Sequence, residues 1–281
     1  GVGSSTNGAG AFGASVNILT NDLKSNPYGA YTISAGSFNT LRHTFELGTG
    51  LVKGFTFDVR LSNIRSDGFI DRASSDLQSW FASAAWYRKK TSFKLNVFSG
   101  REKTYQAWYG VPQDSLASNR RYNPAGAYFD AAGNEQFYKN EIDFYKQSHT
   151  QFFIQHEIKN GLLLSIGLYH TLGAGYYEQY RQDKLAKYGL PDIILASLNN
   201  GVLTPDTLKK TDLIRQRWLD NQFYGGVFSL KANPWKRLNL VFGGGWNHYQ
   251  GKHFGEVIWA KYANALPNGY RYYENNATKT D

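Results

Sequence analysis

The feature that most constrains this chain is a two-residue alternation of apolar and polar side chains. In the clearest segment, 55–62 (FTFDVRLS), every odd position is apolar and every even position is polar. A period of two places the two kinds of side chain on opposite faces of a β-strand. The pattern predicts about nine strands between residues 28 and 249, at 31–35, 41–47, 55–61, 80–87, 93–97, 151–158, 162–168, 223–230 and 238–242.

The connections between these segments alternate in length. Short ones are expected at 48–54, 88–92, 159–161 and 233–236, and long ones at 67–77, 106–147, 177–219 and from 251 onward. Tight turns at one end and long loops at the other are typical of a transmembrane β-barrel. Aromatic residues near the strand ends suit the girdles of such a barrel, although ordinary β-sandwich packing is the alternative reading.

Composition is compatible with this architecture. The 281 residues include 29 Gly, 16% aromatic residues, no Cys and no Met, which indicates a processed chain or a piece of a longer one. The lack of Cys fits an oxidising envelope compartment. No run of about 18 apolar residues occurs, which excludes a transmembrane helix, but barrel strands need only about 10 residues. The mean hydropathy of −0.50 therefore does not argue against a membrane.

The net charge of +9 does not favour a nucleic-acid partner. The Lys and Arg residues are spread through turns and loops, with no block of like charges and no RNA-binding motif. Basic loops that face anionic lipopolysaccharide or an anionic ligand explain the charge at least as well.

The first stretch, residues 1–20, carries two competing patterns. Gly8, Gly10 and Gly13 spell G-x-G-x-x-G, which binds dinucleotides when it follows a strand and opens a helix. Here it follows a polar segment and precedes an alternating one, so a nucleotide site is disfavoured. Glycines at tight, closely packed turns are the simpler explanation.

The same residues resemble the end of the plug domain of TonB-dependent outer-membrane receptors. The resemblance lies in Asn7-Gly8, the AGAFGA run at 9–14, Val16-Asn17-Ile18 and Thr20, with Gly8, Gly10, Gly13 and Asn17 as the plug turn. The stretch departs from the family by having Asn7 where many members have Tyr, and Ala14 where many have Gly. Segments 67–77, 98–112, 217–221 and 253–257 further resemble a Bacteroidetes-type branch.

The resemblance implies an all-β fold, namely an antiparallel transmembrane β-barrel with long extracellular loops. The complete barrel would have 22 strands and contain a plug, and this chain would supply part of it. Residues 1–20 would end the plug, 21–27 would be a linker, and 28–281 would form the N-terminal part of the barrel. It also implies active uptake of a scarce nutrient, such as an iron-siderophore, haem or cobalamin, across the bacterial outer membrane. A passive porin or an adhesive barrel without energy coupling is the alternative.

The partners implied are TonB, through an N-terminal segment that this sequence does not contain, together with outer-membrane lipid and lipopolysaccharide, a small nutrient ligand and a surface lipoprotein. No cofactor is expected. Enzymatic function is not expected either, because no H-E-x-x-H or G-x-S-x-G motif occurs, although a small outer-membrane enzyme is conceivable. His149 and His156 lie seven residues apart on a strand, on opposite faces, so no metal site is predicted.

Loop aromatic and basic residues are the candidate ligand contacts, because aromatic faces and guanidinium groups suit a flat, anionic or sugar-like solute. They are Tyr105, Trp108, Tyr109, Arg120, Arg121, Tyr122, Tyr176, Tyr177, Tyr180 and Arg181. The alternative is that these residues pack the loops and girdles. Apolar residues at three- and four-residue spacing predict short helices at 184–198 and 207–218, as folded pieces or a lid within a long loop.

Overall fold

The computed structural model describes residues 23–199, 202–235, 237–262, 266–267 and 269–280. The predicted plug turn, with Gly8, Gly10, Gly13 and Asn17, lies outside the described residues, as does the start of the expected linker. Residues 23–27 lead into the first strand without helix or strand of their own.

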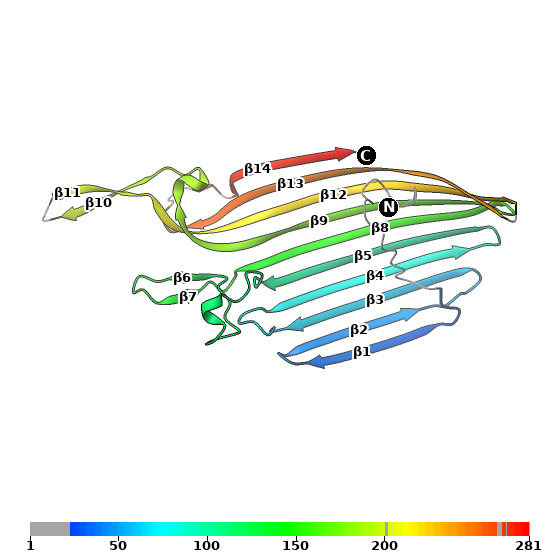
Figure 1. Cartoon of the computed structure of the whole chain (residues 1–281), viewed down its shortest axis with the longest axis horizontal. Coiled ribbons are helices and arrows are strands. Elements are labelled where there is room, and N and C mark those ends of the chain that lie inside the picture. The colour runs from blue at the N-terminus through cyan, green and yellow to red at the C-terminus, as the bar shows by residue number, and fades with distance from the viewer. Residues whose placement is uncertain (1–22, 200–201, 236, 263–265, 268, 281) are drawn as a thin grey trace.

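The main body is one antiparallel sheet of ten strands that follow one another in chain order (Figure 1). The strands are β1 (Tyr28–Gly36), β2 (Thr40–Gly48), β3 (Phe55–Ser66), β4 (Ser75–Tyr87), β5 (Thr91–Tyr105), β8 (Ile142–Lys159), β9 (Leu162–Lys184), β12 (Lys210–Trp235), β13 (Leu238–Ala260) and β14 (Tyr270–Thr280). Nine of them contain the nine alternating segments of the sequence. The tenth, β14, falls in a segment that was expected to be a loop.

Two small hairpins extend from the main sheet at the same end (Figure 1). One is β6 (Ala127–Phe129) with β7 (Glu135–Phe137), and the other is β10 (Ile193–Asn199) with β11 (Val202–Leu208). Both belong to the long connections predicted between strands.

The predicted alternation of short and long connections is confirmed from β3 onward, whereas the 37–39 connection before it has three residues and the 49–54 connection has six. Residues 49–54, 88–90, 160–161 and 236–237 connect strands at one end of the sheet, which we call the turn end. Residues 37–39, 67–74, 106–141, 185–209 and 261–269 connect them at the other, the loop end. The 160–161 turn is only two residues long, and Gly161 meets its geometry with a φ of 76°.

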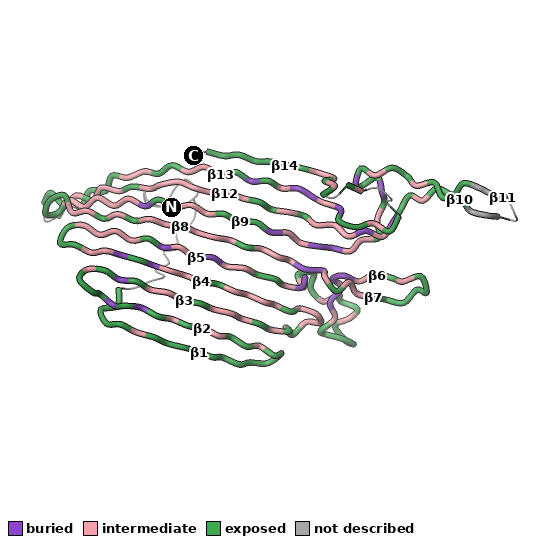
Figure 2. Tube along the Cα trace, turned by 180° about the vertical axis from the view of Figure 1, so that it is seen from behind, coloured by how far each residue is buried: buried purple, intermediate pink, exposed green. Residues whose placement is uncertain are grey.

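The two faces of the sheet differ in chemistry because the strand registers keep the alternation in line from strand to strand. One row pairs Phe57, Ala84, Leu95, Phe152, Leu168, Gly226 and Trp246 in turn. We call this side the apolar face. Its large side chains are exposed, with Phe57 at 49% and Leu168 at 50%. Figure 2 shows a mixture of exposed and partly buried positions along the longer strands, whereas β1 is exposed along almost its whole length. A contiguous apolar surface of this kind needs lipid or another apolar surface to cover it.

The opposite side of the sheet, which we call the polar face, carries hydrogen-bonded polar side chains. They lie at the same level along the strands as the apolar row. Ser83 Oγ donates to Asn96 Oδ1 at 2.9 Å, and Asn96 Nδ2 donates to Gln151 Oε1 at 3.4 Å. Ser83 and Asn96 are buried. Three neighbouring strands are thus linked by side chains as well as by their backbone ladders.

The two helices predicted at 184–198 and 207–218 are wrong. Within 184–198 the structure has a single 3-10 turn, Leu185–Tyr188, followed by the start of β10, and residues 210–218 belong to β12. Residues here alternate in a strand whose two faces both contact protein, so apolar side chains occur on both faces and imitate helical spacing. No described helix is long and apolar enough to cross a membrane.

Glycines on the polar face make room for tyrosines from the neighbouring strand. Tyr145 of β8 pairs with Gly175 of β9, and its ring extends over Gly173. A Cβ added at Gly173 would lie 2.1 Å from the Tyr145 hydroxyl, and one at Gly175 would lie 2.2 Å from the backbone oxygen of Phe144. These positions therefore have no space for a side chain, and the sheet presents a low-relief surface there.

Gly175→Ala should destabilise the sheet, because the added methyl group meets backbone atoms that cannot turn away. We expect a cost of about 1–3 kcal/mol in the free energy of unfolding, as for other overpacked sites. The measurement is the midpoint of urea unfolding of the full-length protein, with the gel mobility of the folded form as the signal. Gly100→Ala is the matched control, since its nearest neighbour would lie 4.0 Å away. Equal midpoints for both variants would contradict the close approach at Gly175.

Candidate functional site

The loop end is shaped by strands that project beyond their neighbours. Pairing between β8 and β9 stops at Asp143 and Tyr177, whereas β9 continues with β12 as far as Lys184 and Lys210. Residues 178–184 of β9 therefore have one edge without a neighbouring strand. The 106–141 connection covers this edge.

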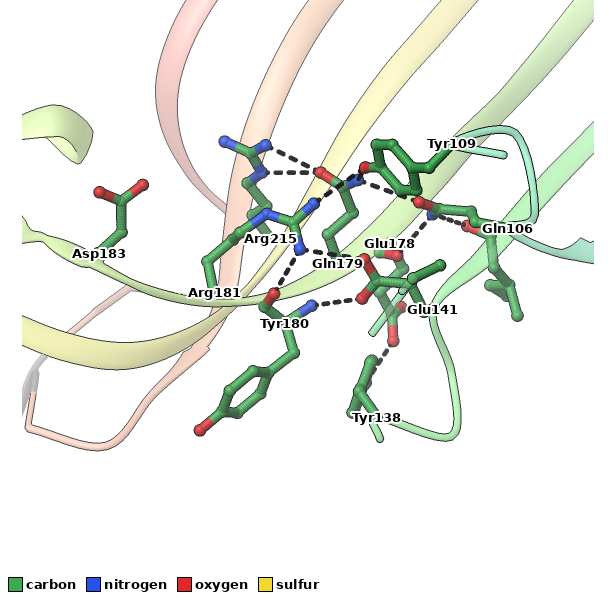
Figure 3. A network of polar contacts seen from close by, with 12 residues as sticks. Gln106, Tyr109, Tyr138, Glu141, Glu178, Gln179, Tyr180, Arg181, Asp183 and Arg215 are labelled. Atoms are coloured by element: carbon green, nitrogen blue, oxygen red, sulfur yellow. Dashed lines mark hydrogen bonds and ion pairs between the residues drawn. The ribbon is translucent and has the colours of Figure 1, made fainter. Parts of the chain in front are cut away.

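Side chains of this connection take the place of the missing strand. Gln106 Nε2 donates to the backbone oxygen of Glu178 at 2.9 Å and to that of Ile142 at 2.9 Å. The backbone N–H of Tyr180 donates to Glu141 Oε2 at 2.9 Å. Two backbone groups of this edge, on Glu178 and Tyr180, are satisfied in this way without extending β8, and the connection is held against the sheet (Figure 3).

Glu141 is the anchor of this contact. Its side chain is fully buried and forms an ion pair with Arg181, with 3.0 Å between Oε1 and Nη1. Burial raises the pKa of the Glu141 carboxyl, while Arg181 and the Tyr180 N–H oppose that shift by favouring the carboxylate. A second buried carboxylate, Glu178, accepts hydrogen bonds from Tyr138 Oη at 2.6 Å and Gln216 Nε2 at 2.7 Å.

Glu141→Ala should release the 106–141 connection, because the Tyr180 N–H and the Arg181 guanidinium both lose their acceptor. We expect a local loss of about 1–3 kcal/mol, the cost of leaving a buried donor unpaired. The readout is faster proteolysis within 106–141 while the sheet stays folded.

Glu141→Gln keeps an acceptor for the N–H and should have a smaller effect. Asp114→Asn, on an exposed part of the same connection, is the control. Proteolysis at the wild-type rate in Glu141→Ala would show that this carboxylate does not hold the connection.

Next to this anchor, two arginines extend from the polar face of β12. Arg215 donates from Nη2 to Gln179 Oε1 at 2.8 Å and from Nη1 to the Tyr188 hydroxyl at 3.2 Å. Arg217 donates from Nε to the Tyr273 hydroxyl at 3.2 Å, and its guanidinium lies 5.4 Å and 5.5 Å from the ring centroids of Tyr177 and Tyr273.

Both arginines are held by neutral groups. None of the ion pairs between described residues includes Arg215 or Arg217. Because their positive charges are positioned but not neutralised, they can attract an anion. Arg217 is exposed on this face, between the two tyrosine rings. We call Arg215, Arg217, Tyr177 and Tyr273 the arginine–tyrosine cluster.

Four of the residues predicted as ligand contacts lie together here: Tyr177 belongs to the cluster, and Trp108, Tyr109 and Arg181 lie beside it. Trp108 contacts Tyr177 edge to face at 5.8 Å, and Tyr109 accepts hydrogen bonds from Gln179 at 3.2 Å and Arg181 at 3.5 Å. Trp108 and Tyr109 are both about half exposed, at 52% and 53%. Their role in binding stays a prediction, but the structure places them at one location.

The other predicted contacts are engaged elsewhere. Tyr105 is buried and donates to the backbone oxygens of Ala125 and Tyr138. Tyr176 points to the apolar face, where its ring packs against Trp218 with 4.6 Å between the ring centroids and a tilt of 46°. Tyr180 packs against Tyr128 at 4.4 Å, under the β6–β7 hairpin.

The three predicted residues at 120–122 connect or decorate loops. Arg121 donates from Nε to the backbone oxygen of Phe69 at 2.8 Å and pairs with Asp71 at 3.5 Å, which joins the 106–141 connection to the 67–74 connection. Tyr122 donates to Glu135 Oε1 at 2.6 Å. Arg120 is exposed. These three do not meet the arginine–tyrosine cluster.

Arg215 and Arg217 were not among the predicted contacts, because 207–218 was interpreted as a helix. Their spacing of two residues was the available signal, since i and i+2 share one face of a strand. Among the described residues no group of three or more His, Asp or Glu side chains is arranged to hold a metal ion.

Two solved structures share this fold. The ferripyoverdine receptor of the outer membrane of Pseudomonas aeruginosa superposes with a TM-score of 0.59 and 14% identity, covering 93% of this chain and 32% of that one. The ferric-catecholate import receptor Fiu of E. coli K12 superposes with a TM-score of 0.53 and 10% identity, covering 100% of this chain and 50% of that one.

The sheet has the fold of part of a TonB-dependent receptor barrel. The chain spans about a third to a half of the length of these two receptors. At such low identity the similarity concerns the fold alone. The sequence matches no family model and no curated protein.

Proposed function

We propose that this chain forms part of an outer-membrane receptor that takes up a small anionic nutrient into a bacterium. The observation that carries the proposal is the arginine–tyrosine cluster. It lies at the loop end of the polar face of the sheet, and the opposite face is apolar. Lipid would cover the apolar face, and the polar face would line the interior of the barrel. A ligand entering from the loop end would then meet Trp108, Tyr109 and Arg217 on one surface.

Several finer features belong to the same proposal. Uptake is active and driven by TonB, and the first 20 residues are the end of a plug that closes the barrel. The similarity to receptors that bind iron-siderophores supports an iron-siderophore as the nutrient. Haem and cobalamin are alternative nutrients of comparable size. The loop segments that resemble a Bacteroidetes-type branch support an origin there, with lipopolysaccharide and a surface lipoprotein as partners.

Energy coupling separates this function from that of a passive porin or adhesive barrel. A strain that lacks the gene should lose growth on one limiting source among iron-siderophore, haem, cobalamin and glycan. Loss of TonB in the wild-type strain should abolish the same growth. Growth that depends on the gene but survives loss of TonB would favour a passive porin.

Arg217→Gln should weaken binding of the nutrient identified in that growth test. Loss of one charge-assisted contact predicts about a tenfold higher Kd. The measurement is equilibrium binding to whole cells. Lys89→Gln, an exposed cation at the turn end, is the matched control and should bind as the wild type does. An unchanged Kd for Arg217→Gln would show that the cluster does not bind the nutrient.

Replacing Trp108 and Tyr109 together with Ala should reduce uptake without reducing the amount of assembled barrel. Both side chains are half exposed, so their loss leaves the sheet intact, while the aromatic surface beside Arg217 disappears. Uptake of labelled nutrient and the heat-dependent gel mobility of the barrel give the two readouts. Unchanged uptake would show that these two residues do not contact the nutrient.

A further inference from the structure

A hollow of about 560 Å³ lies on the apolar face, towards the loop end of β1–β5 and β8. Its apolar lining comes from Tyr31, Phe45, Leu61 and Trp80, and its basic lining comes from Arg65, Arg101 and Lys146. Trp80 and Tyr31 are 43% and 60% exposed. The hollow therefore combines an apolar floor with cations on one side.

Strand register places these cations directly above the apolar floor. Phe45, Leu61 and Trp80 form one row across β2, β3 and β4. Two residues further towards the loop end, Arg101 of β5 pairs with Lys146 of β8. Successive alternate residues share a face, so the two rows point to the same side of the wall.

One further row adds two more cations and a single carboxylate. Asp76 of β4 pairs with Arg65 of β3 and with Lys103 of β5. Four cations, Arg65, Arg101, Lys103 and Lys146, thus share this part of the face with one carboxylate. We call them the basic cluster.

Asp76 does not neutralise the basic cluster. It lies 3.8 Å from Arg65 Nε and 3.7 Å from Arg101 Nη2, so it is shared between two guanidinium groups at long range. Neither Lys103 nor Lys146 takes part in an ion pair between described residues. Arg101 Nε is buried and has no hydrogen-bond partner. The cluster therefore has unused donors and excess positive charge beside an apolar surface.

We propose that this hollow binds the phosphate group of a membrane lipid. The basic cluster would contact the phosphate, and an acyl chain would lie along Trp80, Leu61 and Phe45. Cations at the border of an apolar band attract anionic headgroups, and phosphate suits guanidinium donors. The inference rests on the proposed function in one respect, namely that lipid covers the apolar face.

The test uses the full-length protein purified in detergent, with lipid A and its dephosphorylated form as probes. Native mass spectrometry or a fluorescence titration should show binding of phosphorylated lipid A, with the dephosphorylated form binding at least about tenfold more weakly. Arg101→Gln combined with Lys146→Gln should cause a similar loss. Trp80→Ala should weaken the binding of both lipids, because it removes part of the apolar surface that the acyl chain contacts.

Lys89→Gln combined with Lys90→Gln is the control, because it removes the same charge at the turn end, away from the hollow. It should bind lipid A as the wild type does. Inorganic phosphate alone should compete weakly, which separates a lipid site from a free-anion site.

Equal binding of the two lipids, or unchanged binding by the Arg101 and Lys146 variant, would overturn the proposal. Strong competition by free phosphate would overturn it as well. Nutrient binding by the same variant distinguishes this failure from that of the proposed function. The variant should keep the wild-type Kd for the nutrient, because the basic cluster and the arginine–tyrosine cluster lie on opposite faces.

Discussion

Backbone hydrogen bonding across a continuous antiparallel ladder is the constraint on which this structure depends. A chain that crosses hydrocarbon must pair its N–H and C=O groups internally, since lipid offers no partners. In the proposed membrane setting, the ten strands of the sheet meet this demand, because each pairs with the next strand of the sheet in chain order. The ladder also fixes the register, and the register brings the alternating side chains of each strand into common rows. The two chemically different faces are a consequence of the ladder.

At the loop end the strands differ in length, so part of one strand has no neighbouring strand to pair with. β9 and β12 have 23 and 26 residues, whereas β8 has 18. On the edge left open by β8, the side chains of Gln106 and Glu141 pair the backbone oxygen of Glu178 and the N–H of Tyr180. Folded connections can therefore attach to the wall with the same hydrogen-bond groups that join strands. This attachment also uses the charge of Arg181, while Arg215 and Arg217 keep theirs available.

Much of the fold could be predicted from the sequence, because the alternation in segments such as 55–62 reflects two different environments. The strand β14 escaped detection because YRYYENNATKT has polar residues on both sides of the strand. Residues 210–218 were mistaken for helix for the opposite reason, since both sides of β12 contact protein there.

The candidate site was harder to predict, because a loop tyrosine looks the same in sequence whether it packs or binds. Tyr105 and Trp108 illustrate this: one is 7% exposed and the other 52%. The partner of each ring is set by contacts between distant segments, such as Glu141 with Arg181. The spacing of Arg215 and Arg217 places both on one face of a strand, but the neutral character of their partners is visible only in the structure.

The two outermost strands of the described sheet, β1 and β14, each pair on one side only. Each free edge presents a row of backbone donors and acceptors, and every unsatisfied group in hydrocarbon costs several kcal/mol. In the proposed receptor, these unpaired edge groups oppose the transfer of the apolar face into lipid. We therefore expect insertion into a bilayer to be coupled to the pairing of both edges.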